Sequence, residues 1–111
     1  MAGRFEIKES AGGKFIFNLK AGNGQIILSS ESYETKQGAE KGIESVRKSA
    51  PDDNRYERKT AKNGEAFFIL KAGNGEPLGR SETYSSVSAM DNSVESVKKN
   101  ALDAEVVNLP D

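Results

Sequence analysis

Two copies of one polar pattern contain most of the residues that could do chemistry in this chain. Each copy has a lysine before a Gly-Asn-Gly turn and, farther along, a Ser-Glu-x-Tyr segment. An ammonium, a carboxylate and a phenol close together could bind a polar ligand or, in an enzyme, transfer protons. We therefore expect two twofold-related ligand sites. Their residues are Lys20, Asn23, Glu31 and Tyr33 in one copy and Lys71, Asn74, Glu82 and Tyr84 in the other.

Each of these groups also has a purely structural explanation. Asn-Gly between two strand-like runs is a strong hairpin signal, because both central residues can adopt a positive φ. LKAGNG is not a phosphate loop, since such a loop lies between a strand and a helix and is followed by Lys-Ser/Thr. The tyrosines can pack on the start of a helix, and exposed strand lysines protect against aggregation. Duplication for the sake of a stable core therefore remains an alternative.

The sequence repeats itself at a spacing of 51 residues. Phe5–Ala50 aligns without a gap with Tyr56–Ala101, and LKAGNG occurs at 19–24 and 70–75. A unit below roughly 50 residues buries too little surface to be stable alone. We therefore predict a single domain over 1–111 with a shared core. Repeat 1 covers about 5–50, repeat 2 covers about 56–101, and a C-terminal strand covers 105–109.

Hydrophobic periodicity predicts three strands and a helix in each repeat. In the first repeat the strands lie near 5–8, 15–21 and 25–29, and a helix capped by Thr35 spans 36–50. The second repeat follows the same order, with Ser85 or Ser86 as the helix cap. The predicted fold is α+β, with two β-β-β-α(-β) repeats sharing one antiparallel sheet of at least six strands and both helices packed on one face.

The same periodicity identifies the core, an irregular strand at Pro77 and an apolar pair on the other sheet face. Pro77 should keep the third strand of repeat 2 short, and should place it at a sheet edge or leave it unpaired there. Phe67 and Ile69 point to the other sheet face, where they could form a partner site or be covered by the C-terminal segment. The expected shared core comprises Phe17, Leu19, Ile43, Val46, Phe68, Leu70, Val94 and Val97.

Composition excludes several kinds of site. The chain has no cysteine and no histidine, so it lacks thiolates, the usual general base at neutral pH and the commonest metal ligand. We expect no cofactor and no metal. A net charge of −1 argues against nucleic-acid binding. No apolar run is long enough for a membrane helix, and the N-terminus does not read as a signal peptide, so we expect a cytoplasmic protein.

The combination of LKAGNG, Ser-Glu-x-Tyr and (Ile/Val)-Glu-Ser-Val-(Arg/Lys)-Lys resembles the YegP-like family of small bacterial proteins. The resemblance covers nearly the whole chain. It implies a β-β-β-α-β unit whose C-terminal strands cross over to complete a common sheet, and it carries no established activity. Two residues depart from the pattern: Arg58 replaces an apolar residue, and Pro77 lies in a strand.

We therefore expect a non-catalytic binding or interaction module. It should be a monomer, because its two repeats pair within one chain, and its partner is an unknown protein or small ligand. Two alternatives remain open. One is a weak single-stranded nucleic-acid binder that uses Phe67 with tyrosines and lysines of the sheet. The other is an enzyme that works through Glu31/Glu82, Lys20/Lys71 and Tyr33/Tyr84.

Overall fold

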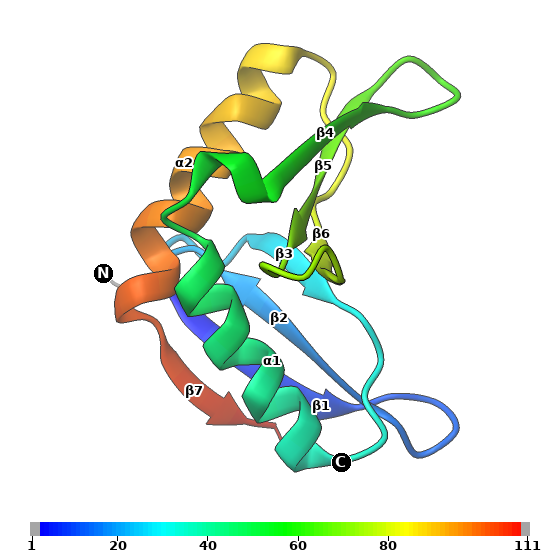
Figure 1. The fold of residues 1–111 in the computed structure, drawn as a ribbon, viewed down its shortest axis with the longest axis vertical. Coiled ribbons are helices and arrows are strands. Elements are labelled where there is room, and N and C mark those ends of the chain that lie inside the picture. Colours follow the sequence, from blue (N-terminus) through cyan, green and yellow to red (C-terminus); the bar gives the residue numbers. More distant parts are fainter. Residues whose placement is uncertain (1–2, 110–111) are drawn as a thin grey trace.

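A mixed β-sheet with two helices on one face forms the fold of residues 3–109, the part of the chain described by the computed structural model (Figure 1). This confirms the predicted α+β class. The first repeat contains β1 (Arg4–Glu9), β2 (Phe15–Lys20), β3 (Ile26–Ser30) and α1 (Lys36–Ser49), and a short 3-10 helix, η1 (Asp53–Arg55), follows it. The second contains β4 (Tyr56–Thr60), β5 (Ala66–Lys71), β6 (Pro77–Arg80), α2 (Val87–Asp103) and β7 (Glu105–Asn108).

The sheet has the strand order β4-β5-β6-β3-β2-β1-β7. The predicted C-terminal strand is present, and it crosses the repeat boundary to pair with β1. It runs parallel to β1, whereas all the other neighbours are antiparallel, so the sheet is mixed rather than wholly antiparallel. The prediction was wrong on this point because it extended the antiparallel order of the hairpins to the C-terminal strand, which follows a helix and can pair in either direction.

The two repeats join at a short pairing between β3 and β6. Ser29 lies opposite Arg80, and Ser30 lies opposite Gly79. A Cβ added at Gly79 would be 2.7 Å from the carbonyl oxygen of Ser29. Only glycine therefore allows the backbones to approach this closely at the centre of the sheet.

Of the two expectations for Pro77, the sheet edge was wrong, whereas the lack of a partner holds on the β3 side, where only Gly79 and Arg80 of this strand are paired. The strand is short, as predicted, but it lies inside the sheet between β5 and β3. Pro77 is its first residue and pairs with Lys71, next to a register shift between Leu70 and Lys71. A proline at the first position of a strand beside a bulge removes little from the hydrogen-bond ladder, which is why an interior strand tolerates it here.

The predicted hairpins form, but with a different turn. Gly24 has φ +86°, and no residue other than glycine has a positive φ in the described part of the chain. Gly24 N–H donates to Ala21 O at 2.9 Å, and Ala21 N–H donates to Gln25 O at 2.9 Å. Asn23 therefore does not take the positive φ expected from the Asn-Gly pair. The longer loop, with a left-handed glycine at its end, explains this difference.

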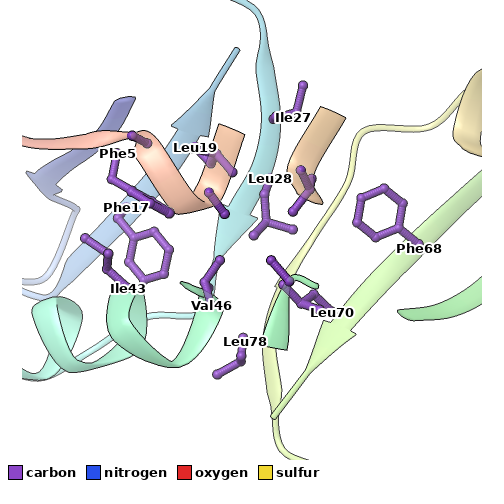
Figure 2. Packing of buried hydrophobic residues seen from close by; sticks show 14 of the residues in the cluster. Phe5, Phe17, Leu19, Ile27, Leu28, Ile43, Val46, Phe68, Leu70 and Leu78 are labelled. Atoms are coloured by element: carbon purple, nitrogen blue, oxygen red, sulfur yellow. The ribbon is translucent and has the colours of Figure 1, made fainter. Parts of the chain in front are cut away.

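Both helices begin at the predicted caps. The Thr35 hydroxyl accepts from Gly38 N–H, and the Ser86 hydroxyl accepts from Ala89 N–H. The side chains on their inner faces meet those of the sheet in one continuous cluster drawn from both repeats (Figure 2). All eight predicted core residues belong to it and are at most 1% exposed. Neither helix therefore has a core formed by its own repeat alone.

Arg47 of α1 ties the end of α2 to the rest of the molecule. Its guanidinium donates to the carbonyl oxygen of Ala101 at 2.9 Å and to that of Ala104 at 2.8 Å. It also lies 5.2 Å from the centre of the Phe5 ring. These contacts satisfy C-terminal helix carbonyls and place the start of β7 beside β1.

Candidate functional site

A polar groove runs between the β2–β3 hairpin and α2. Three neighbouring hollows with volumes of about 460, 210 and 420 Å³ share lining residues and together form it. We call it the α2 groove. Its main lining residues are Lys20, Asn23, Gln25, Ile27, Glu82, Tyr84, Asn92, Ser96 and Asn100.

Both repeats contribute to this groove. Lys20, Asn23 and Gln25 come from repeat 1, whereas Glu82, Tyr84 and the α2 residues come from repeat 2. The structure thus brings four of the eight predicted site residues together, but they are Lys20 and Asn23 of repeat 1 with Glu82 and Tyr84 of repeat 2, not the four residues of one repeat. Tyr33 is bridged to Phe15, and Lys20 lies at the other end of the same strand, roughly 16 Å away at a rise of about 3.3 Å per residue.

Lys20 sits at one end of the groove and is held by an ion pair. Its Nζ lies 2.9 Å from Oε1 of Glu6, whose carboxylate also pairs with Arg4. The hydrogen bond from Lys20 is the main cause that lowers the pKa of Glu6, and burial opposes it. Because Glu6 engages the ammonium, the charge of Lys20 is already paired where its side chain lines the groove.

Tyr84 forms the middle of the groove. Its backbone exchanges two hydrogen bonds with Ala66, at 2.7 and 2.8 Å, and its hydroxyl donates to Ser93 Oγ at 2.8 Å. The ring is therefore fixed at both ends and is half-buried. It presents a rigid face to the hollow, as a preformed binding site requires.

Asn23 supports the hairpin and also lines the groove. Its Oδ1 accepts from the backbone N–H of Gln25 at 3.0 Å, and Asn74 holds Glu76 in the same way in repeat 2. These bonds account for Asn23 and Asn74 as turn residues. The hairpin joins two strands, as predicted, so it is not a phosphate loop.

The Ser-Glu-x-Tyr segments also have a structural role. The hydroxyl of Ser30 accepts from the backbone N–H of Phe17, and that of Ser81 accepts from that of Phe68. These two serine hydroxyls continue the hydrogen-bond ladder of the sheet at the point where the regular backbone pairing with β2 and β5 ends. This explains why the serine recurs in both copies without invoking a ligand.

The corresponding residues on the other side of the molecule are arranged differently. Tyr33 stacks on Phe17, with ring centres 6.0 Å apart and an interplanar angle of 15°, and burial raises the pKa of its hydroxyl. Glu31 is exposed, and Lys71 pairs with Glu57 at 2.9 Å. Glu31, Tyr33, Lys71 and Asn74 lie outside the α2 groove.

The α2 residues of the groove were missed by the sequence analysis. Asn92, Ser96 and Asn100 are spaced by four, so they form one stripe beside the apolar face of the helix. Asn100 Nδ2 donates to Ser96 O at 2.8 Å. This stripe of small neutral side chains could have been found from the same periodicity that identified the core.

The sheet face opposite the helices holds the predicted apolar pair. Phe67 and Ile69 are partly exposed, and the guanidinium of Arg80 lies 5.4 Å from the centre of the Phe67 ring. The C-terminal strand does not cover them, since β7 and β5 lie toward opposite ends of the strand order. Of the two explanations offered by the sequence, covering by residues up to 109 is therefore excluded.

Two features are absent from residues 3–109. No helix among them is both long and apolar enough to cross a membrane. No group of three or more Asp and Glu side chains there is arranged to hold a metal ion.

Comparison with known proteins places the repeats in a family. Residues 10–57 and 61–108 each match the family described as "Domain of unknown function (DUF1508)". The chain is 50% identical over 109 residues to the "UPF0339 protein in ptx operon 5'region" of Stutzerimonas stutzeri, covering 98% of each. It is 49% identical over 100 residues to UPF0339 protein YegP of Escherichia coli K12, covering 90% of this chain and 91% of YegP.

Solved structures agree with the fold. The solution NMR structure of YegP from Escherichia coli, described as a protein of unknown function, matches with a TM-score of 0.92 and 46% identity, covering 97% of this chain and 93% of that one. A UPF0339 protein from Shewanella oneidensis matches with a TM-score of 0.92 and 44% identity, covering 98% and 92%. These similarities support the arrangement of both repeats and describe no activity.

Proposed function

The chain belongs to the DUF1508 family, the two-repeat UPF0339 proteins, and from its surface we propose that it is a non-catalytic binding module whose ligand site is the α2 groove. The proposal includes the monomeric state and the cytoplasmic location expected from the sequence. One observation carries it: neutral hydrogen-bonding side chains from both repeats line a continuous groove around the fixed ring of Tyr84.

The lining indicates the chemistry of the ligand. Asn92, Ser96 and Gln25 offer amide and hydroxyl groups, and each amide can both donate and accept. The charged groups stand at the two ends, with Lys20 and Glu82 at one and Glu95 and Lys99 at the other. A neutral ligand rich in hydroxyl or amide groups matches the middle of this groove, because buried charge would find no counter-ion there.

A titration of the isotopically labelled protein tests this proposal. Neutral oligosaccharides and uncharged short peptides, two sources of the same chemistry, are added while the backbone amide shifts are followed. We expect one source to move the amides of Gln25, Tyr84 and Ser96 together. Shifts confined to the Phe67 face, or none with either source, would contradict the α2 groove as the ligand site.

Matched substitutions sharpen the test. Asn92→Ala and Ser96→Ala should each weaken binding several-fold by removing a hydrogen bond worth about 1 kcal/mol. Their counterparts in α1, Lys41→Ala and Ser45→Ala, lie 51 residues earlier and outside the groove, so they should leave the affinity unchanged. Equal losses in both pairs would point to a general effect on folding.

The enzyme alternative has one observation in its favour, since Lys20, Glu82 and Tyr84 line a single hollow. Two contacts argue against it: Glu6 engages the ammonium of Lys20, and the hydroxyl of Tyr84 donates to Ser93. Neither group is poised to accept a proton from a substrate. Turnover of any substrate that is lost in Glu82→Gln and retained in Glu31→Gln would favour the enzyme.

A further inference from the structure

One edge of the sheet carries a parallel strand, and its counterpart edge carries none. β7 pairs with β1 from Arg4 opposite Glu105 to Ile7 opposite Asn108. In the second repeat β4 takes the place of β1, and it ends the strand order on the other side. Within residues 3–109, the backbone groups of β4 that point away from β5 therefore have no strand beside them.

The missing strand follows from the way the repeats are joined. Residues 54–57 lie 51 positions before the residues of β7, so they are the segment that should pair with β4. However, β4 itself begins at Tyr56 and uses part of this segment as its own start. The sheet therefore has seven strands, where two repeats of four strands each would have eight.

We propose that the outer edge of β4 binds an extended segment of a partner protein as an eighth strand, parallel to β4. Backbone hydrogen bonds to an open edge supply the affinity in this kind of recognition, and alternate side chains supply the specificity. The proposal concerns a different surface from the α2 groove, so the two can be tested separately.

The β1–β7 pair shows which side chains such a segment would carry. Arg55, the last residue of η1, holds the position at which Arg4 faces Glu105. Its guanidinium pairs with Asp52 at 3.3 Å and is partly exposed, so an acidic first residue can add a second carboxylate beside it. Tyr56 corresponds to Phe5, which faces Val106, so an apolar second residue fits. Glu57 corresponds to Glu6, which faces Val107, so an apolar third residue fits.

The fourth position differs between the two edges. Arg58 stands where Ile7 faces Asn108, and its guanidinium bonds Asp91 at 3.0 Å and Asp53 at 3.2 Å. Its side chain is still 35% exposed, so a polar or acidic fourth residue can accept a further hydrogen bond from it. The partner segment is thus acidic, apolar, apolar and then polar.

An exposed apolar residue marks the same place on the helix side. Lys36 of α1 lines a hollow with Asn108 and Leu109 at the end of β7. Its counterpart in α2 is Val87, which is 62% exposed. A valine here would gain an apolar neighbour when an eighth strand is added.

The charges on β4 disfavour a second copy of this chain as the occupant. Two β4 strands pairing antiparallel about their centres would set Arg58 opposite Arg58. Like charges directly opposite each other destabilise a strand pair. A partner with a polar or acidic fourth residue opposite Arg58 avoids this repulsion.

A peptide with the chain's own sequence for residues 103–109 serves as the probe. When it is titrated into the isotopically labelled full-length protein, the amide of Arg58 should shift and exchange more slowly. The amide of Tyr56 should shift only, because its N–H already donates to Asp53 O. Tyr56 and Arg58 correspond to Phe5 and Ile7, and Ile7 O accepts from Leu109 N–H at 2.9 Å. A spin label on the peptide N-terminus should broaden Tyr56 more than Thr60, because the pairing is parallel.

Modified peptides distinguish strand pairing from nonspecific binding. Alternation along a strand places the amide of Val107 on the same side as that of Leu109, so N-methylation at Val107 should abolish binding. N-methylation at Val106, whose amide faces away, should leave most of it, and replacing Glu105 of the peptide by lysine should weaken it several-fold.

Three results would overturn the proposal. The first is the absence of shifts in β4 at the highest peptide concentration. The second is a response of Phe5 and Ile7 instead, which means that the peptide replaces β7. The third is a concentration-dependent dimer in sedimentation with protected β4 amides, which would assign the edge to a second copy.

Discussion

The hydroxyl of Tyr84 donates to the side chain of Ser93 at 2.8 Å, and at the equivalent place in the first repeat Tyr33 packs against Gly42, where there is no side chain to meet. A Cβ at Gly42 would lie 2.3 Å from the Tyr33 oxygen and 3.0 Å from Phe17. Both tyrosines are partly buried against the core, and this one difference between Ser and Gly lets Tyr33 pack over Gly42 while Tyr84 bonds Ser93 and borders the α2 groove. The two repeats thus share a fold without sharing a site.

Gly42→Ala should therefore destabilise the protein. The added methyl group must displace Tyr33 from its stacking on Phe17, and overpacking of this kind costs about 1–3 kcal/mol. Denaturant unfolding measures the loss. Ser93→Ala is the matched control, since it removes one hydrogen bond worth about 1 kcal/mol without a clash. A Gly42→Ala protein as stable as the wild type would show that Tyr33 is free to move.

The sequence predicts the fold well because its signals are local or repeated. Periodicity marks the core faces of β2 and α1, and Thr35 and Ser86 are the residue types that cap helices. The turn at Asn23 and the position of Pro77 were predicted less well. Both depend on loop length and strand order, which pairing across the sheet decides.

The candidate site was predicted only in part, for a physical reason. Reasoning by repeat groups Lys20 with Tyr33, because they are neighbours in sequence. The antiparallel pairing of β3 with β6 instead brings the hairpin of one repeat to the tyrosine of the other, so Lys20 meets Tyr84. No local pattern shows which repeat supplies the facing residue.

Arg47→Met should loosen the end of α2 and β7 together. The guanidinium bonds three carbonyl oxygens at the end of this helix, those of Ala101, Leu102 and Ala104. Loss of charged hydrogen bonds at a partly buried site costs about 1.5–3 kcal/mol. Hydrogen exchange should accelerate at Leu109 relative to β5. Lys48→Met, at an exposed neighbouring residue, is the control. Equal effects of both changes would show that Arg47 does not hold the end of α2 in place.

Deletion of the residues after Ala104 should expose the edge of β1. Each kcal/mol lost should lower Tm by roughly 4–8 °C in a domain of this size. The amides of Phe5 and Ile7 should lose their protection, and the free peptide of residues 103–109 should restore it. Unchanged protection in the truncated chain would show that β7 contributes nothing to the order of β1.

The stability of the protein should also depend on pH through Glu6. The hydrogen bond from Lys20 holds the pKa of Glu6 below its ordinary value in the folded state. Because the folded pKa is the lower one, this stabilisation is complete above the unfolded pKa and disappears as the pH falls through the folded pKa. Glu6→Gln should therefore lower Tm at neutral pH, and the difference in Tm from the wild type should become smaller in acid.

Glu57→Gln is the control for this prediction. Glu57 holds the counterpart position and also pairs with a lysine, but its carboxylate is more exposed, so the change should have a smaller effect on Tm at neutral pH. A Glu6→Gln protein whose Tm deficit stays constant from neutral to acidic pH would show that the Lys20 ion pair is not the source of the stabilisation.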